Sequence, residues 1–298
     1  MYPFTPTPLV RLGNLFPDQA VHAKCEYLAP SGSFKARGIV HLLERLRRDG
    51  QTKPLIVPSM GNTALGAAVG ARAYGFSMVG VVPRTITRAK DEKLQALGVE
   101  LLKVDGGGSA LLARATEVAA ERGGYFVHPH LDPLWTDGYR AIAAEVLHAL
   151  PECRSLVLPL GGGGLLMGLT EHLADHPAPV RLYACEPYNF PKYARYSHAR
   201  SATIADGLLL DVPHPKVQER IKQAGIPVSL VPEAAIRAAL AGLYRTQALV
   251  VEPSSAITVA FVQEHGPELE APVCVILTGE NVAREDFHRL LGEAGAGA

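Results

Sequence analysis

Short apolar segments alternate with longer stretches of helical periodicity along almost the whole chain. A continuously apolar run bounded by turn residues suits a strand that is buried on both faces, whereas apolar residues three and four positions apart suit a helix that covers a sheet. Strands that alternate with helices at this spacing form parallel sheets with helices on both faces. The sequence therefore predicts an α/β fold. The predicted strands are 55–58, 79–82, 101–104, 156–159, 182–184 and 273–277, and the predicted helices are 64–74, 89–97, 110–121, 140–149, 165–174, 234–245 and 256–263.

The composition excludes several classes of protein. With 298 residues, of which 48% are apolar, the chain can bury a large core and is expected to form about two domains. Its 29 basic and 29 acidic side chains give a net charge of +0, so no surface for nucleic-acid phosphates is expected. No apolar run approaches the length of a bilayer span, and the N-terminus lacks a charged start followed by an apolar stretch. We therefore expect a cytoplasmic protein that binds neither nucleic acid nor membrane.

The four cysteines are scattered along the chain and form no Cys-x-x-Cys pair. A disulfide framework or a zinc site would require closer or repeated spacing. We interpret all of them as small apolar core residues that stay reduced. They are Cys25, Cys153, Cys185 and Cys274.

Four consecutive glycines, Gly161–Gly164, separate a predicted strand from a predicted helix. Ordering four glycines costs much conformational entropy. The turn therefore needs either positive φ angles or another group that approaches its backbone very closely. Successive N–H groups at the positive end of a helix dipole form a site for phosphate. The turn lacks the Gly-Lys-Ser/Thr of a Walker loop and the Gly-x-Gly-x-x-Gly of a dinucleotide site. A phosphate cradle is favoured over the alternative of a tight structural turn.

Lys35 lies in the segment PSGSFKARG (30–38), which predicts a turn leading into a helix capped by Ser31 or Ser33. The positive end of a helix dipole disfavours a cation. The position therefore suits a lysine that is neutral or covalently bound rather than a solvated surface lysine, and such an amine is a nucleophile for carbonyl compounds. A nucleophilic lysine together with a phosphate cradle points to pyridoxal phosphate, a phosphorylated aldehyde.

Further motifs place these two segments in a longer pattern. In order, the pattern contains TPL at 7–9, SGSFKARG at 31–38, SMGNTALG at 59–66, LGGGGLLMG at 160–168, TIADGL at 203–208, VEPSSA at 251–256 and LTGEN at 277–281. Together these motifs resemble the serine/threonine dehydratase family within the fold type II pyridoxal-phosphate enzymes, which also include cysteine synthase, threonine synthase and serine racemase. The resemblance covers nearly the whole chain. It implies two domains, each with a central, mostly parallel sheet flanked by helices.

The resemblance also implies a role for the motif residues near the cofactor. Lys35 would hold pyridoxal phosphate as a Schiff base, with Phe34 packed beside it, and Asn62 would bind the phenolic oxygen of the ring. Thr278 would face the pyridine nitrogen. A hydroxyl does not force protonation of this nitrogen, so the ring is a weaker electron sink, which favours loss of a β leaving group. The residues whose N–H groups would hold the phosphate are Gly161, Gly162, Gly163, Gly164 and Leu165.

The segment Ser59, Met60, Gly61, Asn62 and Thr63 precedes a predicted helix, and its N–H groups are candidates for binding the substrate carboxylate at the helix start. The alternative is that Asn62 or Thr63 caps this helix. Serine racemases place a second serine where this chain has Met60. Methionine has no exchangeable proton, so racemisation is not expected as the main activity.

The chain departs from the family pattern at an expected cation site. Many family members bind a divalent cation near an acidic residue that is matched here by Glu186, but a later ligand position holds Lys192, and Phe190 is bulky. Because an ammonium group repels a cation, we expect no bound metal.

The segment WTDGYRA at 135–141 is a second departure, because dehydratases usually have Gly-Gln-Gly-Thr here. Asp137 and Arg140 either pair on the surface, which is the commoner case, or face the cofactor. In the second case they would change recognition of the substrate side chain together with Tyr139.

These patterns together predict a two-domain enzyme. Residues 49–134 would form a small domain, inserted between residues 1–48 and 135–298 of a large domain that binds the cofactor. The predicted reaction is β-elimination from a hydroxy amino acid such as serine or threonine, giving a 2-oxo acid and ammonia, with Lys35 as the general base. The alternatives are a β- or γ-replacement synthase and, less favoured, a non-catalytic protein that binds pyridoxal phosphate. The resemblance also implies a homodimer.

Overall fold

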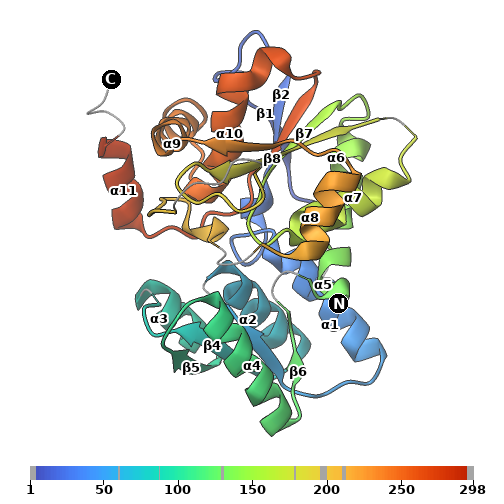
Figure 1. Ribbon diagram of the computed structural model, residues 1–298, viewed down its shortest axis with the longest axis vertical. Coiled ribbons are helices and arrows are strands. Elements are labelled where there is room, and N and C mark those ends of the chain that lie inside the picture. Colours follow the sequence, from blue (N-terminus) through green and yellow to red (C-terminus); the bar gives the residue numbers. More distant parts are fainter. Residues whose placement is uncertain are drawn as a thin grey trace. The chain divides into compact units, whose positions relative to one another are not determined.

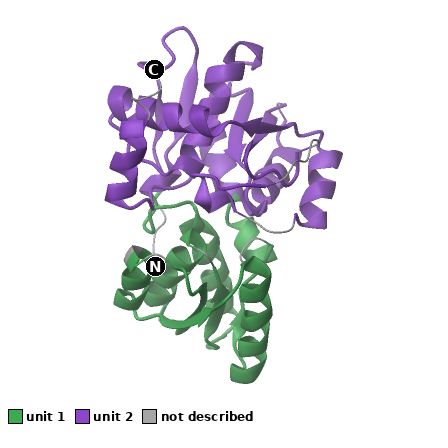
Figure 2. Cartoon of the chain, turned by 60° about the vertical axis from the view of Figure 1, so that its left-hand side comes forward, with its two compact units in different colours: residues 1–5, 29–139 green, residues 6–28, 140–298 purple. Residues whose placement is uncertain are grey.

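The computed structural model describes residues 5–59, 61–86, 88–128, 131–177, 179–194, 200–209 and 213–293 (Figure 1). The chain divides into two compact units (Figure 2). Each unit has its own mostly parallel sheet with helices packed on it, so the predicted α/β fold class is confirmed. Unit 1 comprises Met1–Thr5 and Ala29–Tyr139, and unit 2 comprises Pro6–Leu28 and Arg140–Ala298.

Strands and helices alternate along unit 1. Its strands are β3 (Leu55–Pro58), β4 (Met78–Pro83), β5 (Glu100–Val104) and β6 (Tyr125–Phe126), and its helices are α1 (Lys35–Arg48), α2 (Asn62–Tyr74), α3 (Arg88–Ala96), α4 (Gly108–Arg122) and α5 (Pro133–Asp137). The strands are all parallel in the order β5-β4-β3-β6. The chain therefore runs outward from β3 to β5 and returns to β6 on the other side of β3, so that ligand-binding loops are expected at the carboxyl ends of β3 and β6.

Helix α1 packs closely against α2 and α5, and glycines permit the approach. A Cβ atom on Gly66 of α2 would lie 3.0 Å from the Cβ of Lys35, and one on Gly38 of α1 would lie 2.5 Å from the indole of Trp135. These contacts group residues 29–48 and 135–139 with the predicted small domain, 49–134, so the limits of unit 1 differ from the predicted domain limits. The position of a helix in the chain does not reveal which surface its apolar face covers.

Unit 2 contains a six-stranded sheet. Its strands are β1 (Leu9–Arg11), β2 (Val21–Lys24), β7 (Ser155–Pro159), β8 (Arg181–Pro187), β9 (Val228–Val231) and β10 (Val273–Ile276). Its helices are α6 (Arg140–Ala149), α7 (Gly164–Ala174), α8 (Pro215–Gln223), α9 (Glu233–Gln247), α10 (Pro253–His265) and α11 (Arg284–Glu293), and short 3-10 helices span Glu26–Leu28, Asp206–Leu208 and Gly266–Glu268.

The strand order of unit 2 is β1-β2-β10-β7-β8-β9, with β1 antiparallel to β2 and every other pair parallel. From β7 the chain proceeds through β8 to β9 and then returns to β10 on the other side of β7. Helices α6, α7 and α8 lie on the opposite side of the sheet from α9 and α10 (Figure 1). Strands β7 and β10 are therefore neighbours at a topological switch point, where sheets of this kind bind ligands at the carboxyl ends of the strands.

Helix α10 is the central helix of unit 2, since each residue from Pro253 to Val262 is buried. It packs against β7, β8, β9 and β10 and against α9. A helix that is apolar all round is typical of a core position. The serines at its start therefore lie inside the unit rather than at its surface.

Each predicted strand and helix is present, with both ends within three residues of the predicted ones. The elements that were not predicted are short or partly polar: β1, β2, β6, β9, α5, α8 and α11. Three of the strands among them, β1, β6 and β9, lie at sheet edges, where a continuous apolar run is not required. Every helix in the described ranges falls short of the length and apolar character that a bilayer span demands.

All four cysteines are free and buried, which confirms their interpretation as core residues. Burial raises the pKa of the Cys25 thiol to about 11 and that of Cys153 to about 12. Because only the thiolate is nucleophilic, we expect iodoacetamide at pH 8 to modify no cysteine of the native protein and all four after unfolding in guanidinium. Mass spectrometry of intact protein counts the adducts, and rapid labelling of the native protein would contradict the buried positions.

Candidate active site

Lys35 is the first residue of helix α1, at the start of a helix as predicted, and it lies in unit 1, whereas the sequence grouped residues 1–48 with the large domain. Phe34 occupies the N-cap position, and no described side chain caps the helix. Ser31 Oγ instead donates a hydrogen bond to the carbonyl oxygen of Ser33 over 3.2 Å. The predicted cap by Ser31 or Ser33 is therefore wrong, because these side chains stabilise the preceding turn.

Aromatic residues hold the start of this helix in place. Lys35 Nζ lies 4.7 Å from the centre of the Phe34 ring, and the Phe34 ring lies 4.8 Å from that of Tyr139. Trp135 Nε1 donates to the Tyr139 hydroxyl, and both of these side chains are fully buried. The segment that departs from the family pattern thus contacts the residue that precedes Lys35. Sequence reasoning left the place of Tyr139 open because this contact joins positions far apart in the chain.

The charged residues of the same segment have partners at the surface. Asp137 Oδ2 lies 3.0 Å from His41 Nε2 in unit 1. Arg140, the first residue of α6 in unit 2, lies 3.9 Å from Glu171 and 3.8 Å from Asp175. These half-exposed contacts are typical of surface ion pairs.

The candidate carboxylate-binding turn links β3 to α2 in unit 1. Ser59 Oγ accepts hydrogen bonds from the N–H groups of Gly61 (3.0 Å) and Ala64 (2.9 Å). Ser59 thus caps α2, and the alternative of a cap by Asn62 or Thr63 is wrong, because the helix already begins at Asn62. Met60 lies outside the described residues.

Lys90 lies beside this turn and was not among the predicted site residues. A Cβ atom on Gly61 would lie 3.2 Å from Lys90 Nζ. Lys90 belongs to the first turn of α3, which follows the carboxyl end of β4. A cation in the first turn of a helix opposes the helix dipole. This is the same signal that singled out Lys35, and it could have identified Lys90 from the sequence.

The predicted phosphate cradle forms the junction between β7 and α7 in unit 2. Gly163 has a φ of 86°, in the left-handed region that favours glycine. No acceptor among the described residues takes a hydrogen bond from the N–H groups of Gly161–Gly164. These groups lie at the positive end of the α7 dipole, so they can bind an anion.

Gly163 also approaches α8 closely, because a Cβ atom on it would lie 2.5 Å from Val217. We expect Gly163→Ala to lower the free energy of unfolding by about 2–4 kcal/mol, since backbone strain and overpacking act together. Gly75→Ala is the control, because Gly75 has a φ of 75° with open space around it, and it should cost only about 1 kcal/mol. Guanidinium denaturation measures both losses. Adding Val217→Ala to Gly163→Ala should restore part of the lost stability. Equal losses in Gly163→Ala and Gly75→Ala would contradict the proposed collision between the new Cβ atom and Val217.

Thr278 lies in the turn that follows β10, and Ser255 at the start of α10 forms hydrogen bonds with this turn. Ser255 Oγ donates to the carbonyl oxygen of Gly279 (2.8 Å), accepts from the Gly279 N–H (2.7 Å) and lies 3.2 Å from Thr278 Oγ1. Ser255 and Thr278 are both buried. Because the single proton of Ser255 is used by Gly279, Thr278 is the donor in the 3.2 Å contact, and its hydroxyl can rotate to donate to a bound ligand instead. Sequence reasoning placed Ser255 in a motif but did not find this contact.

Four of the five motifs of unit 2 meet at this edge of the sheet. Register pairs Val275 of β10 with Val157 of β7, so Thr278 and the glycine turn follow neighbouring strands. A Cβ atom on Gly161 would lie 3.4 Å from the carbonyl oxygen of Gly207, whose N–H donates to Ser254 Oγ (3.0 Å). A buried hydroxyl donor near a row of N–H donors fits a ligand that carries both a phosphate and a ring nitrogen, and pyridoxal phosphate carries both.

Glu186, near the carboxyl end of β8, and Lys192, which follows that strand, form a fully buried ion pair at the same edge of the sheet. Lys192 Nζ lies 3.2 Å from Glu186 Oε1, and neither side chain is exposed. The N–H groups of Lys192, Tyr193 and Ala194 also donate to the Glu186 carboxylate. Burial lowers the pKa of Lys192, and the nearby carboxylate opposes this effect. Within the described ranges, no three His, Cys, Asp or Glu side chains gather as metal ligands would.

Three comparisons with known proteins place the chain in a family. The chain is 29% identical over 271 residues to the L-threonine ammonia-lyase of Geobacter sulfurreducens, covering 88% of this chain and 67% of that protein. It is also 29% identical to the serine racemase of Homo sapiens, over 87% of this chain and 80% of the relative. The processed form of threonine deaminase isoform 2 from Solanum lycopersicum has a similar structure, with a TM-score of 0.89 and 23% identity over 99% of this chain and 84% of that one. The family described as pyridoxal-phosphate dependent enzyme matches residues 1–279, and the chain therefore belongs to this family.

Proposed function

We propose that this protein is a pyridoxal-phosphate-dependent lyase that removes the β-hydroxyl of a hydroxy amino acid such as serine or threonine, giving a 2-oxo acid and ammonia. The observation that carries the proposal is the hydroxyl donor Thr278, which follows the strand next to the one that leads into Gly161–Gly164. The similarity to proteins named L-threonine ammonia-lyase supports the proposal.

The residues of unit 2 would bind and tune the cofactor. When bound, pyridoxal phosphate withdraws electrons from the Cα atom of the substrate. The N–H groups of Gly161–Leu165 would hold the phosphate. Thr278 would donate to the pyridine nitrogen without adding a charge to the ring, so negative charge at Cα is held weakly and prompt departure of the β-hydroxyl is favoured.

The residues of unit 1 would carry the proton and bind the substrate. Lys35 would bind the cofactor aldehyde and, once the substrate amine displaces it, remove the Cα proton as general base. Phe34 would pack beside the ring, and Asn62 would hydrogen-bond its phenolic oxygen. The turn from Ser59 to Thr63 would bind the substrate carboxylate at the start of α2, and the charge of Lys90 beside Gly61 would add to this attraction.

We expect Lys90→Gln to raise KM about tenfold with little change in kcat. A charge-assisted contact with the carboxylate is present both before and during the reaction, so its loss weakens binding without changing the chemical step. Steady-state kinetics with L-serine and L-threonine measure both constants. Lys93→Gln on the same helix is the matched control and should leave KM unchanged, because Lys93 is exposed. A fall in kcat with constant KM would contradict a role for Lys90 in carboxylate binding.

One assay tests the proposed reaction against its alternatives. The purified protein, supplied with pyridoxal phosphate, is incubated with L-serine or L-threonine, with and without sulfide, and the oxo acid, cysteine and D-serine are measured. Oxo acid as the main product supports elimination. Cysteine that appears only with sulfide would support a replacement synthase, and D-serine as the main product a racemase. Bound cofactor without any product would support a non-catalytic binding protein.

We further propose that the protein acts as a homodimer in the cytoplasm, as the family resemblance implies. Light scattering on the eluate of a gel-filtration column tests the dimer, and a monomer mass would contradict it. Fractionation of cells that express the protein tests its location.

A further inference from the structure

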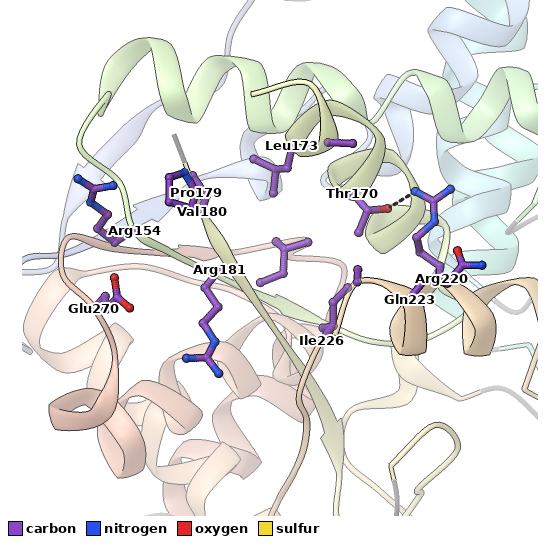
Figure 3. Close-up of a pocket in the computed structure, with 14 residues that line it drawn as sticks. Arg154, Thr170, Leu173, Pro179, Val180, Arg181, Arg220, Gln223, Ile226 and Glu270 are labelled. Carbon is purple, nitrogen blue, oxygen red and sulfur yellow. Dashed lines mark hydrogen bonds between the residues drawn. The ribbon is translucent and has the colours of Figure 1, made fainter. Parts of the chain in front are cut away.

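A cavity of about 620 Å³ lies at the amino ends of β7, β8 and β9 in unit 2 (Figure 3). Arg154 directly precedes β7, Arg181 is the first residue of β8, and Ile226 lies just before β9. The glycine turn and Thr278 follow the carboxyl ends of the same sheet. Since β8 is seven residues long, the cavity is separated from that edge by roughly 20 Å of strand. It is therefore distinct from the candidate active site.

The cavity combines an apolar floor with positive charge. Leu173 of α7, Leu182 of β8 and Ile226 form the floor. Figure 3 shows Arg154 and Arg220 on opposite sides of this floor. Arg220 Nη1 donates to Thr170 Oγ1 over 3.0 Å, which fixes the guanidinium group at the α7 and α8 end of the cavity.

The arginines that line this cavity are not used in ion pairs with the described carboxylates. Within the described residues, no carboxylate lies within 4 Å of the guanidinium groups of Arg154, Arg181 or Arg220. Eight other arginines have such a partner, namely Arg45, Arg84, Arg88, Arg114, Arg122, Arg140, Arg237 and Arg289. Arg181 points to the other face of the sheet, where its guanidinium group lies 5.5 Å from the centre of the Tyr183 ring. Glu270 is the sole acidic side chain among the lining residues, so Arg154 and Arg220 leave the cavity with a net positive charge. Unpaired guanidinium groups around a cavity are donors for a planar or tetrahedral anion.

We propose that this cavity binds a small organic anion, whose phosphate or carboxylate group contacts Arg220 and whose apolar part lies on the floor of Leu173, Leu182 and Ile226. The volume is in the range of small-molecule sites. A guanidinium group recognises the oxygens of phosphate and of carboxylate in the same way. Arg154, on the opposite side of the floor from Arg220, would bind a second acidic group of a longer ligand. The inference does not depend on the reaction catalysed at the other edge of the sheet.

Calorimetric titration of the cofactor-saturated full-length protein tests this proposal with three probes of similar size. Phenyl phosphate carries a phosphate, benzoate a carboxylate and phenol no charge, and bound pyridoxal phosphate keeps the glycine turn filled. We expect at least one of the two anions to bind with one-to-one stoichiometry and at least tenfold more tightly than phenol. The tighter of the two anions identifies the acidic group that the cavity prefers. Equal affinity for phenol, or no binding of either anion, would overturn the proposal.

Variants locate the binding. Arg220→Gln should weaken the preferred anion about tenfold or more, because the charge-assisted contacts are lost. Arg245→Gln is the matched control, since Arg245 is an exposed arginine on α9 of the same unit, outside the cavity. Leu173→Glu is a second, independent change that places a negative charge on the floor and should also weaken the anion. Binding that neither Arg220→Gln nor Leu173→Glu alters would show that the anion binds elsewhere and would overturn the assignment.

Discussion

Replacement of Lys35 with alanine is expected to lower kcat about a thousandfold or more. Lys35 is proposed both to bind the cofactor aldehyde and to take the Cα proton, and loss of a group that acts in bond making and in proton transfer removes both contributions. The variant should keep its fold, because Lys35 is a half-buried residue at the start of α1 and alanine retains the Cβ atom that lies beside Gly66 of α2. Steady-state assays with L-serine measure the loss, and circular dichroism checks the fold.

A labelling experiment separates this role from general damage. Borohydride would reduce the proposed bond between Lys35 and the cofactor to a stable one, so a peptide that contains Lys35 should carry the mass of the reduced cofactor. The Lys35→Ala variant should carry none, whereas Lys93→Ala should be labelled like the parent protein. Full turnover in Lys35→Ala, or label on another lysine of the parent protein, would refute the proposed chemistry of both units.

The strands that carry the site could be predicted because they are buried on both faces. Parallel strands such as β3, β7 and β10 have continuous apolar sequences, and the turns that follow them contain residues that neither strands nor helices favour. The φ of 86° at Gly163 is a requirement of the turn itself, and such local requirements are visible in sequence. The lack of room beside Gly163 comes from Val217 of α8, which the sequence did not reveal.

Contacts between distant segments could not be predicted in the same way. Ser255 and Thr278 are separated by 23 positions and meet only because α10 packs under β10. Lys90 lies beside Gly61 because α3 and α2 are neighbours at the edge of unit 1. A sequence motif marks such residues as unusual, but only the packing of the elements shows which of them touch.

Helix caps were predicted less well for a related reason. Ser31, Ser33, Asn62 and Thr63 all have side chains that can cap a helix. Ser59 caps α2 instead, because the turn brings its hydroxyl within 3.0 Å of two backbone N–H groups. The choice depends on the path of the turn, and several residues with equal capping ability lie along that path.

Replacement of Lys192 with methionine should lower the free energy of unfolding by about 3–5 kcal/mol. Methionine fills much of the volume of the lysine, but it leaves the charge of Glu186 buried and uncompensated, and this is far costlier than the loss of an exposed pair. Such a loss would be a large part of the total stability of an ordinary protein, about 5–15 kcal/mol. The midpoint of guanidinium denaturation, followed by circular dichroism, measures the change.

Two further variants show whether the buried charge is the cause. Arg114→Met removes one partner of an exposed pair with Glu121 and should leave the free energy of unfolding almost unchanged. The double variant Glu186→Gln with Lys192→Met removes both charges, keeps an oxygen acceptor for the backbone N–H groups of residues 192–194, and should recover most of the lost stability. If Lys192→Met costs no more than Arg114→Met, or if the double variant is as unstable as the single one, then the pair does not stabilise this edge of the sheet through its charges. The segment after β8 would then be held by its backbone hydrogen bonds alone.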